Sequence, residues 1–254
     1  MEKQFSIFLI IMSITALVVF IALYFVTAGY GKFASKKWGP SVNNKVGWIL
    51  MECPVFIMMC VLWGMSNRMF EPAVFVIFCI FQTHYLQRSF IFPFLLKGTS
   101  KMPFSIIVMG ITFNLLNALM QGGWLFYISA PHRYAVNWLY SPQFIIGTIL
   151  FFTGMFINIQ SDSIIRHLRK PGDTNHYLPH GGMYNYVTSA NYFGEIVEWA
   201  GFAILTWSFA GVVFLWWTFA NLVPRAATIY NRYQQEFAQQ MRGKKLKRVI
   251  PWIY

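Results

Sequence analysis

Residues 158–199 read NIQSDSIIRHLRKPGDTNHYLPHGGMYNYVTSANYFGEIVEW and separate two strongly apolar parts of the chain. Charged and amide side chains are costly in such surroundings unless a polar ligand or partner groups satisfy them. The polar residues gathered here are Asn158, Asp162, Arg166, Arg169, Lys170, Asp173, His176, His180, Asn191, Glu195 and Glu198. We therefore interpret this stretch as the polar centre of the fold and as the binding site for a polar ligand.

The rest of the chain has the composition of a membrane protein. Of its 254 residues, 57% are hydrophobic and only 11% are charged, and the mean hydropathy is +0.49. A soluble domain carries about 25% charged residues. Apolar runs long enough to cross roughly 30 Å of hydrocarbon lie near 5–27, 45–64, 72–96, 104–129, 143–164 and 199–223. The pattern predicts an all-α membrane protein; the short alternating segments of a β-barrel are absent from the sequence.

The charges indicate how the chain crosses the membrane. If the last apolar run is divided at Ser208, into helices near 189–207 and 209–233, the chain has seven transmembrane helices. Most of the 20 Lys and Arg residues then fall in alternate connections, which the positive-inside rule places in the cytosol. We expect an N-terminus outside, a cytosolic C-terminus and one membrane domain spanning 1–254. The net charge of +12 is thus mainly topological and does not indicate nucleic-acid binding.

Several chemistries are disfavoured by the motifs. Cys53, Cys60 and Cys79 lie in apolar runs without the spacing of a metal site, and no HExxH or GxSxG motif occurs. The loop around Gly181-Gly182 is neither a Walker loop nor a dinucleotide-binding GxGxxG fingerprint. We expect no metal, no hydrolytic centre and no Rossmann domain.

Two helical faces in the polar stretch predict one site. Asn158, Asp162 and Arg166 repeat every four residues, and Arg169 and Lys170 follow before Pro171-Gly172 ends the helix. The next helix carries an amide and two acids at i, i+4 and i+7, namely Asn191, Glu195 and Glu198. The acids would pair with arginines or accept hydrogen bonds from ligand hydroxyls, and the cations suit a phosphate-bearing cofactor.

Polar side chains also interrupt the apolar runs of the first half. Glu52 lies in WILMECPVF, Tyr85 and Arg88 share a helical face in QTHYLQRSF, and Asn114 begins a stripe with Asn117 and Gln121. A bland interpretation remains open for each: a helix-end acid, a packed tyrosine, and amides that bond neighbouring helices. The functional alternative is a pocket in which Glu52 holds the Tyr85 hydroxyl, which donates its proton toward a carbonyl oxygen.

The segment from Gly154 to Ser208 resembles the C-terminal domain of the steroid 5α-reductase family. The residues that carry the likeness are the Asn/Asp face, LRKPG and NxxGE; it extends more weakly to Glu52-Cys-Pro, to His84-Tyr85 with Arg88, and to Ile250–Tyr254. The chain is identified as a member, similar to the mammalian type 2 enzyme and of microbial origin.

The resemblance implies NADPH-dependent reduction of the 4,5 double bond of a 3-oxo-Δ4 steroid by hydride transfer to C5. It implies a multi-pass monomer of the bacterial inner membrane or endoplasmic reticulum, in contact with membrane lipid, whose steroid enters from the bilayer. Helices in 1–129 would mainly serve the steroid, with Glu52 and Tyr85 as catalytic residues and Asn114 beside them. Helices and loops in 143–254 would mainly bind NADPH. The implied cofactor contacts are Arg88, Asn158, Asp162, Arg166, Arg169, Lys170, His176, Asn191, Glu195, Arg225 and Tyr233.

Departures from the family pattern occur at Met51, Met109, His176 and Ile229, and they bear on the identity of the substrate. Related membrane enzymes reduce polyprenols or enoyl-CoA, or methylate isoprenylcysteine, and these activities remain alternatives. A small membrane transporter is the alternative outside enzymes, because intramembrane charges can also line an ion path.

Overall fold

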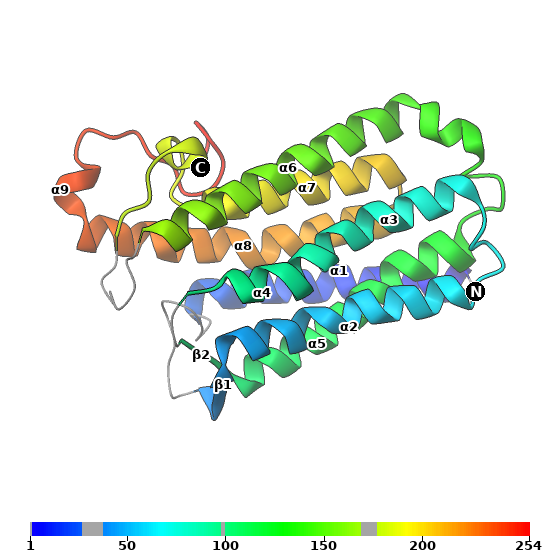
Figure 1. The fold of residues 1–254 in the computed structure, drawn as a ribbon, viewed down its shortest axis with the longest axis horizontal. Helices are drawn as coiled ribbons and strands as arrows, with labels where there is room; N and C mark the ends of the chain where they lie inside the picture. The colour runs from blue at the N-terminus through cyan, green and yellow to red at the C-terminus, as the bar shows by residue number, and fades with distance from the viewer. Residues whose placement is uncertain (1, 27–37, 98–99, 169–176) are drawn as a thin grey trace.

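The computed structural model describes residues 2–26, 38–97, 100–168 and 177–254 as an elongated bundle of helices (Figure 1). Arg169, Lys170 and His176, which were expected to bind cofactor, lie outside the described residues. The long helices of the bundle are α1 (Glu2–Phe25), α2 (Asn44–Gly64), α3 (Pro72–Leu86), α5 (Phe104–Gly123), α6 (Pro142–His167), α7 (Ala190–Thr206) and α8 (Phe209–Glu236). The shorter elements are β1 (Ser41–Asn43), η3 (Gln87–Ile91), α4 (Phe92–Leu95), β2 (Lys101–Pro103), η4 (Trp124–Ile128), η5 (Val136–Tyr140), η6 (Gly182–Asn185) and α9 (Ala238–Met241).

The prediction of an all-α membrane protein is confirmed, but six candidate spans are found among the described residues where seven transmembrane helices were predicted. Among the described residues, 6 helical segments are long and apolar enough to cross a membrane: Glu2–Phe25, Asn44–Gly64, Pro72–Leu95, Phe104–Ile128, Pro142–His167 and Phe209–Glu236. The remaining long helix, α7, has 17 residues and is about 25 Å long at 1.5 Å per residue. It lies beside α6 and α8, and many of its side chains are buried (Figure 1).

The predicted break near Ser208 is also confirmed. Trp207 ends α7 in the left-handed region, with φ of +45°, and the Ser208 side chain accepts a hydrogen bond from the Gly211 N–H at the start of α8. The chain therefore reverses within a few residues and sends α8 back along α7. Pro224 lies inside α8, which continues to Glu236 and so agrees closely with the predicted helix near 209–233.

Glycines hold α6 and α7 in backbone contact. A Cβ added at Gly154 would lie 2.2 Å from Glu198 N, and one at Gly201 would lie 2.3 Å from Phe151 N. Gly147 and Gly194 make equivalent contacts, so glycines seven residues apart on each helix face the other helix. Small residues allow this approach in membrane helices, where packing rather than water exclusion drives association. The contact sets the register between the two polar faces of the sequence.

Two features at one end of the bundle were not predicted. Strands β1 and β2 pair antiparallel, with Val42 opposite Met102, and join the chain before α2 to the chain before α5. A π-helical turn, η3, follows α3, and its Phe92 N–H donates to the Gln87 carbonyl. Pro93 has no N–H for the Ser89 carbonyl, which favours a widened turn at this point.

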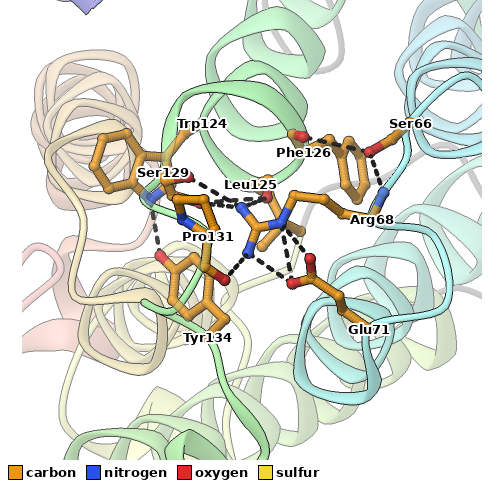
Figure 2. Close-up of polar contacts among 9 residues, drawn as sticks. All are labelled: Ser66, Arg68, Glu71, Trp124, Leu125, Phe126, Ser129, Pro131 and Tyr134. Carbon is orange, nitrogen blue, oxygen red and sulfur yellow. Dashed lines mark hydrogen bonds and ion pairs between the residues drawn. The ribbon is translucent and has the colours of Figure 1, made fainter.

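Arg68 bonds several segments together at the end of the bundle opposite β1 and β2 (Figure 1). Figure 2 shows its contacts. Its guanidinium pairs with Glu71 at 2.8 Å and donates to the carbonyls of Leu125 and Ser129 and to the Ser129 hydroxyl. These carbonyls lie at the C-terminal end of η4, where helical carbonyls lack partners of their own. Arg68 thereby ties the α2–α3 connection to the end of α5.

Tyr134 makes a second closure at the same end. Its hydroxyl accepts from Trp124 Nε1 and donates to the Thr206 carbonyl, both at 2.7 Å (the Trp124 bond is drawn in Figure 2). The side chain is buried, and burial raises the pKa of Tyr134. The tyrosine therefore remains a neutral donor that links the end of α5 to the end of α7.

Candidate active site

Arg88 is the centre of a buried polar network between α3, α6 and α7. Nη1 lies 3.1 Å from Asp162 Oδ2, and Nη2 lies 3.1 Å from Glu195 Oε1. The three side chains are only 11%, 9% and 15% exposed. The sequence placed these residues in one cofactor site and predicted an arginine as a partner of Glu195, but it did not predict that Arg88 would also pair with Asp162.

Two amides complete the network. Asn158 Nδ2 donates to the Asn191 carbonyl and to Glu195 Oε1, at 3.0 and 3.1 Å. Asn191 Nδ2 donates to Asp162 Oδ1 at 3.2 Å. The amide of each helix thus bonds the acid of the other: Asn158 with Glu195, and Asn191 with Asp162. The glycine contact brings the two helices close enough for these bonds. In this form the network satisfies itself, so a ligand must exchange some of these internal bonds for its own.

Two aromatic rings also contact the guanidinium of Arg88. Its carbon lies 4.7 Å from the centre of the Trp48 ring and 4.4 Å from that of Phe92. Such contacts add attraction while leaving the N–H groups free to bond in the guanidinium plane. The π-helical turn carries both Arg88 and the approach to Phe92. Neither aromatic contact was anticipated, because it depends on that turn.

A second polar cluster lies between α2, α3 and α5. Asn114 Nδ2 donates to the Met51 carbonyl at 2.7 Å and to Glu52 Oε2 at 3.1 Å. Asn117 Nδ2 donates to the Tyr85 hydroxyl at 3.0 Å. Within the described chain, Glu52 and Tyr85 are each bonded to an asparagine and not to one another, so the direct Glu52–Tyr85 hydrogen bond expected from sequence is not formed. The stripe on α5 joins them instead.

Gln121 extends this cluster into the bundle. Its Nε2 lies 3.3 Å from Asn117 Oδ1 and 2.9 Å from the Ala210 carbonyl. The amide stripe therefore has two roles, since it links helices as the bland interpretation held and it also orients the Tyr85 hydroxyl.

No role was predicted for His84 from the sequence, and the structure places its side chain beside Glu198 of α7. Its Nδ1 lies 2.8 Å from Glu198 Oε1. Helical spacing alone cannot reveal this pairing, because it does not show which faces of α3 contact α7. The presence of a second acid at i+3 after Glu195 was the only signal in the sequence.

Buried hydroxyls without partners surround the Arg88 network. Among the described residues, Ser89, Ser161, Tyr184 and Ser189 have side-chain oxygens with no hydrogen-bond partner. All are less than 3% exposed. Buried hydroxyls normally find partners, and those left without one require an explanation. Ser89, Ser161 and Ser189 lie within two residues of Arg88, Asp162 and Asn191 in the sequence. Tyr184 interacts electrostatically with Asp162. Hydroxyls in these places fit a ligand rich in hydroxyl and phosphate oxygens.

Tyr184 is a candidate site residue for which the sequence predicted no role. It lies in η6, after Gly181 with its φ of +89°. Burial raises the pKa of Tyr184 well above 10, and the charge of Asp162 adds to this effect. The hydroxyl is therefore a neutral donor next to the acidic face of α6.

The remaining predicted residues lie around this centre. Arg225 of α8 stacks over Tyr192 at 5.5 Å, and Tyr233, two turns on, is buried. Arg166 is half-buried in the last turn of α6. Among the described residues no group of three potential metal ligands occurs.

The positions that depart from the family pattern differ in their surroundings. Met51 is buried against Gly110, where an added Cβ would lie 2.2 Å from Met51 Cγ. It therefore borders Glu52 with an apolar side chain. Met109 is 51% exposed and Ile229 is half-buried, so neither belongs to the Glu52 cluster by contact.

The fold and the site together define an integral membrane protein with two polar clusters inside a helical bundle. A family model described as 3-oxo-5-alpha-steroid 4-dehydrogenase matches residues 100–254. The chain is 35% identical to steroid 5-alpha-reductase DET2 of Gossypium hirsutum over 257 residues, which cover 100% of this chain and 98% of that protein.

Mammalian proteins show the same degree of similarity. The chain is 36% identical to 3-oxo-5-alpha-steroid 4-dehydrogenase 1 of Homo sapiens over 227 residues (89% of this chain, 86% of that protein). It is 34% identical to 3-oxo-5-alpha-steroid 4-dehydrogenase 2 of Sus scrofa over 240 residues (92% and 91%). The chain belongs to the 3-oxo-5-alpha-steroid 4-dehydrogenase family, a family of oxidoreductases that act on CH–CH bonds. The expected family is confirmed, and plant, type 1 and type 2 relatives are similar to comparable degrees.

Proposed function

We propose that the protein reduces the 4,5 double bond of a 3-oxo-Δ4 steroid with NADPH, by hydride transfer to C5. The observation that carries the proposal is the presence of two separate polar clusters in one apolar bundle. The Glu52–Asn114 and Asn117–Tyr85 pairs suit a carbonyl, and the Arg88 network suits a nucleotide. Family membership supports the same substrate class.

The Tyr85 hydroxyl is oriented to act as a hydrogen-bond donor. Its oxygen accepts from Asn117, so its own proton is free for the steroid 3-oxo oxygen. Adding hydride to an enone builds negative charge on that oxygen, which a fixed donor in a dry site stabilises. Glu52 is held beside it by Asn114, and we assign it the role of keeping the tyrosine and the 3-oxo group in place.

The cofactor would be held by the Arg88 network and the groups around it. Asn158, Asn191 and Glu195 offer amides and a carboxylate to a nicotinamide carboxamide or ribose. The buried hydroxyl of Ser161, which directly precedes Asp162 in the sequence, could add a further hydrogen bond. Arg166, Arg169, Lys170, His176, Arg225 and Tyr233 would meet the phosphates and the rest of the nucleotide. When bound, NADPH supplies the hydride, while the protein orients the reacting atoms.

The membrane arrangement follows from the same proposal. With α7 as the seventh crossing, the N-terminus lies outside and the basic connections lie in the cytosol, where NADPH is available. The whole chain forms one domain and acts as a monomer. The steroid enters from the bilayer between helices whose outer faces are apolar.

The test is turnover by the purified protein in nanodiscs. The protein is given NADPH or NADH and a panel of 3-oxo-Δ4 steroids, other enones and a polyprenol, while absorbance at 340 nm and product mass are followed. We expect oxidation of NADPH matched by a gain of two hydrogens in the steroid. Turnover of the polyprenol alone, or retention of S-adenosylmethionine by the purified protein, would contradict the proposal and favour another enzyme of the superfamily.

A further inference from the structure

A buried acid–imidazole pair lies beside Tyr85 and has no part in the function proposed above. The His84 and Glu198 side chains meet at 2.8 Å and are 8% and 0% exposed. His84 directly precedes Tyr85 on α3, and their ring centroids are 4.9 Å apart. On its other side the imidazole contacts the Trp199 ring, at 4.6 Å. The pair therefore belongs to the wall that carries the carbonyl-binding tyrosine.

The pair holds one transferable proton. A carboxyl group with no solvent exposure must keep its proton or have its charge balanced by a contact cation. Imidazolium with carboxylate, and imidazole with carboxylic acid, contain the same number of protons, so the proton is present in either form. Glu198 Oε2 has no hydrogen-bond partner within the described part of the chain, which leaves one oxygen able to bind a proton or a water molecule.

The surroundings of the pair are mostly acidic. Both Glu52 and Glu195 interact electrostatically with His84, and Glu198 interacts with Tyr85. The charged and titratable groups around the imidazole are Glu198 and Glu195 from α7, Glu52 from α2, Tyr85 from α3, and Arg88 from η3, which is paired with Asp162 of α6. Because carboxyl groups outnumber the cation, a proton that enters this part of the bundle is attracted to it.

We propose that His84 and Glu198 store the proton consumed by the reduction and deliver it through Tyr85. The inference rests on the function proposed above. The hydride pair forms the C5–H bond, the π electrons move to the 3-oxo oxygen, and Tyr85 gives that oxygen its proton. His84 then returns a proton to Tyr85 by way of a water molecule between them, and a second water replaces the proton on His84.

The step balances in protons and electrons. The enol becomes the ketone by gaining a proton at C4 and losing the one on oxygen, which is no net change. Each turnover therefore consumes one hydride and one proton. His84 and Glu198 act on the steroid only through Tyr85, and we regard them as positioning and proton-supplying residues.

Two variants separate proton supply from packing. His84→Asn retains a side-chain N–H near the position of Nδ1 but cannot carry an extra proton. We expect its kcat to fall at least ~10-fold with KM values unchanged, and the decline of kcat at alkaline pH to disappear. Glu198→Gln preserves the shape of the side chain but removes the acid from the pair, so the pH profile of its kcat should differ from that of the wild type.

A matched control is Gln82→Met on the same helix. Gln82 is buried and donates to the Phe56 carbonyl at 3.0 Å, so this variant loses a buried hydrogen bond on α3 without touching the pair. It should lower thermal stability and leave the pH profile of kcat unchanged.

Three results are informative, and they are distinguishable. A wild-type profile without an alkaline decline, or a His84→Asn enzyme with wild-type kcat and profile, overturns the proton-supply inference. Wild-type protein that reduces none of the steroids with NADPH refutes the proposed function itself. The expected shifts in both variants, with an unchanged profile in Gln82→Met, support the inference.

Discussion

Asn114 and Asn117 show how single residues prepare the proposed carbonyl site. They lie one turn apart on α5, one bonded to Glu52 and the other to Tyr85. Asn114 donates to one carboxyl oxygen of Glu52, and Asn117 donates to the hydroxyl oxygen of Tyr85. The other Glu52 oxygen and the Tyr85 proton stay available. The acid and the tyrosine are thus oriented without consuming the proton that the reaction needs.

Replacing the tyrosine hydroxyl should affect catalysis more than binding. In Tyr85→Phe we expect kcat to fall by about 100-fold or more, because the donor to the developing oxyanion is lost. The dissociation constant for NADPH, measured by fluorescence titration, should change less than about twofold. Tyr127→Phe is the control, since this exposed tyrosine donates to the Leu62 carbonyl on α2. Wild-type kcat in Tyr85→Phe would remove the tyrosine from the mechanism.

Removing Arg88 should destabilise the protein strongly. Arg88→Met leaves Asp162 and Glu195 buried without their cation, and breaking a buried pair in this way costs about 3–5 kcal/mol. We expect a large fall in the thermal midpoint, measured in nanodiscs by tryptophan fluorescence. Arg88→Lys should recover only part of it, because an ammonium cannot span both acids in the plane between Trp48 and Phe92. An unchanged midpoint in Arg88→Met would show that the acids are satisfied in another way.

At the level of elements, the pair of α6 and α7 determines the site. Asn158 and Asp162 face Asn191 and Glu195 because the helix backbones touch at glycines one and two turns away. A larger side chain in the contact would separate the helices and every hydrogen bond between the two faces.

Gly201→Val should therefore weaken both the fold and the site. The added Cβ would meet the Phe151 backbone at 2.3 Å, and overpacking of this kind costs about 1–3 kcal/mol. We expect a lower thermal midpoint together with weaker NADPH binding. Gly64→Ala at the end of α2, where an added Cβ has no neighbour within 4 Å, is the matched control. Equal behaviour of the two variants would contradict the role of the close contact.

The sequence predicts the helices and the two polar faces, because periodicity and hydropathy are local properties. It places Asn158, Asp162, Asn191 and Glu195 in one site for that reason. It does not reveal the bond from His84 to Glu198, since that depends on which side of α3 meets α7. The asparagines between Glu52 and Tyr85 were visible only as a stripe whose partners were unknown.

Irregular turns and short strands are the other features that could not be predicted from the sequence. The π-helical turn that presents Arg88 depends on the missing N–H of Pro93, and a regular 3.6-residue period does not describe it. The pairing of β1 with β2 joins short segments that are far apart in sequence, and their composition carries little strand signal.

For the whole molecule, the two ends of the bundle have different character. The C-terminal segment lies at one end of the bundle, and the connection from α2 to α3, which contains Arg68, lies at the other end beside the N-terminus (Figure 1). Figure 2 shows the bonds that Arg68 and Tyr134 make there. This end is held by charged and aromatic donors to backbone carbonyls and not by apolar packing alone.

Arg68→Lys should loosen this closed end. A lysine cannot bond Glu71 and the carbonyls after η4 at once, and bonds from charged groups contribute about 1.5–3 kcal/mol each. We expect a thermal midpoint lower by several degrees and faster hydrogen exchange at residues 125–135. Arg242→Lys, at an exposed position, is the control and should have no effect. Unchanged exchange in Arg68→Lys would show that Arg68 does not hold this end.

The closure by Arg68 and Tyr134 has a kinetic consequence. If the steroid enters from the bilayer as proposed, a bundle fastened at this end offers no exit there, and the reduced steroid would leave by the same lateral route. Product and substrate then compete for one passage, and accumulated product should act as a competitive inhibitor toward the steroid. The rate of clearance into the surrounding lipid would then limit steady-state flux when the membrane is loaded with sterol.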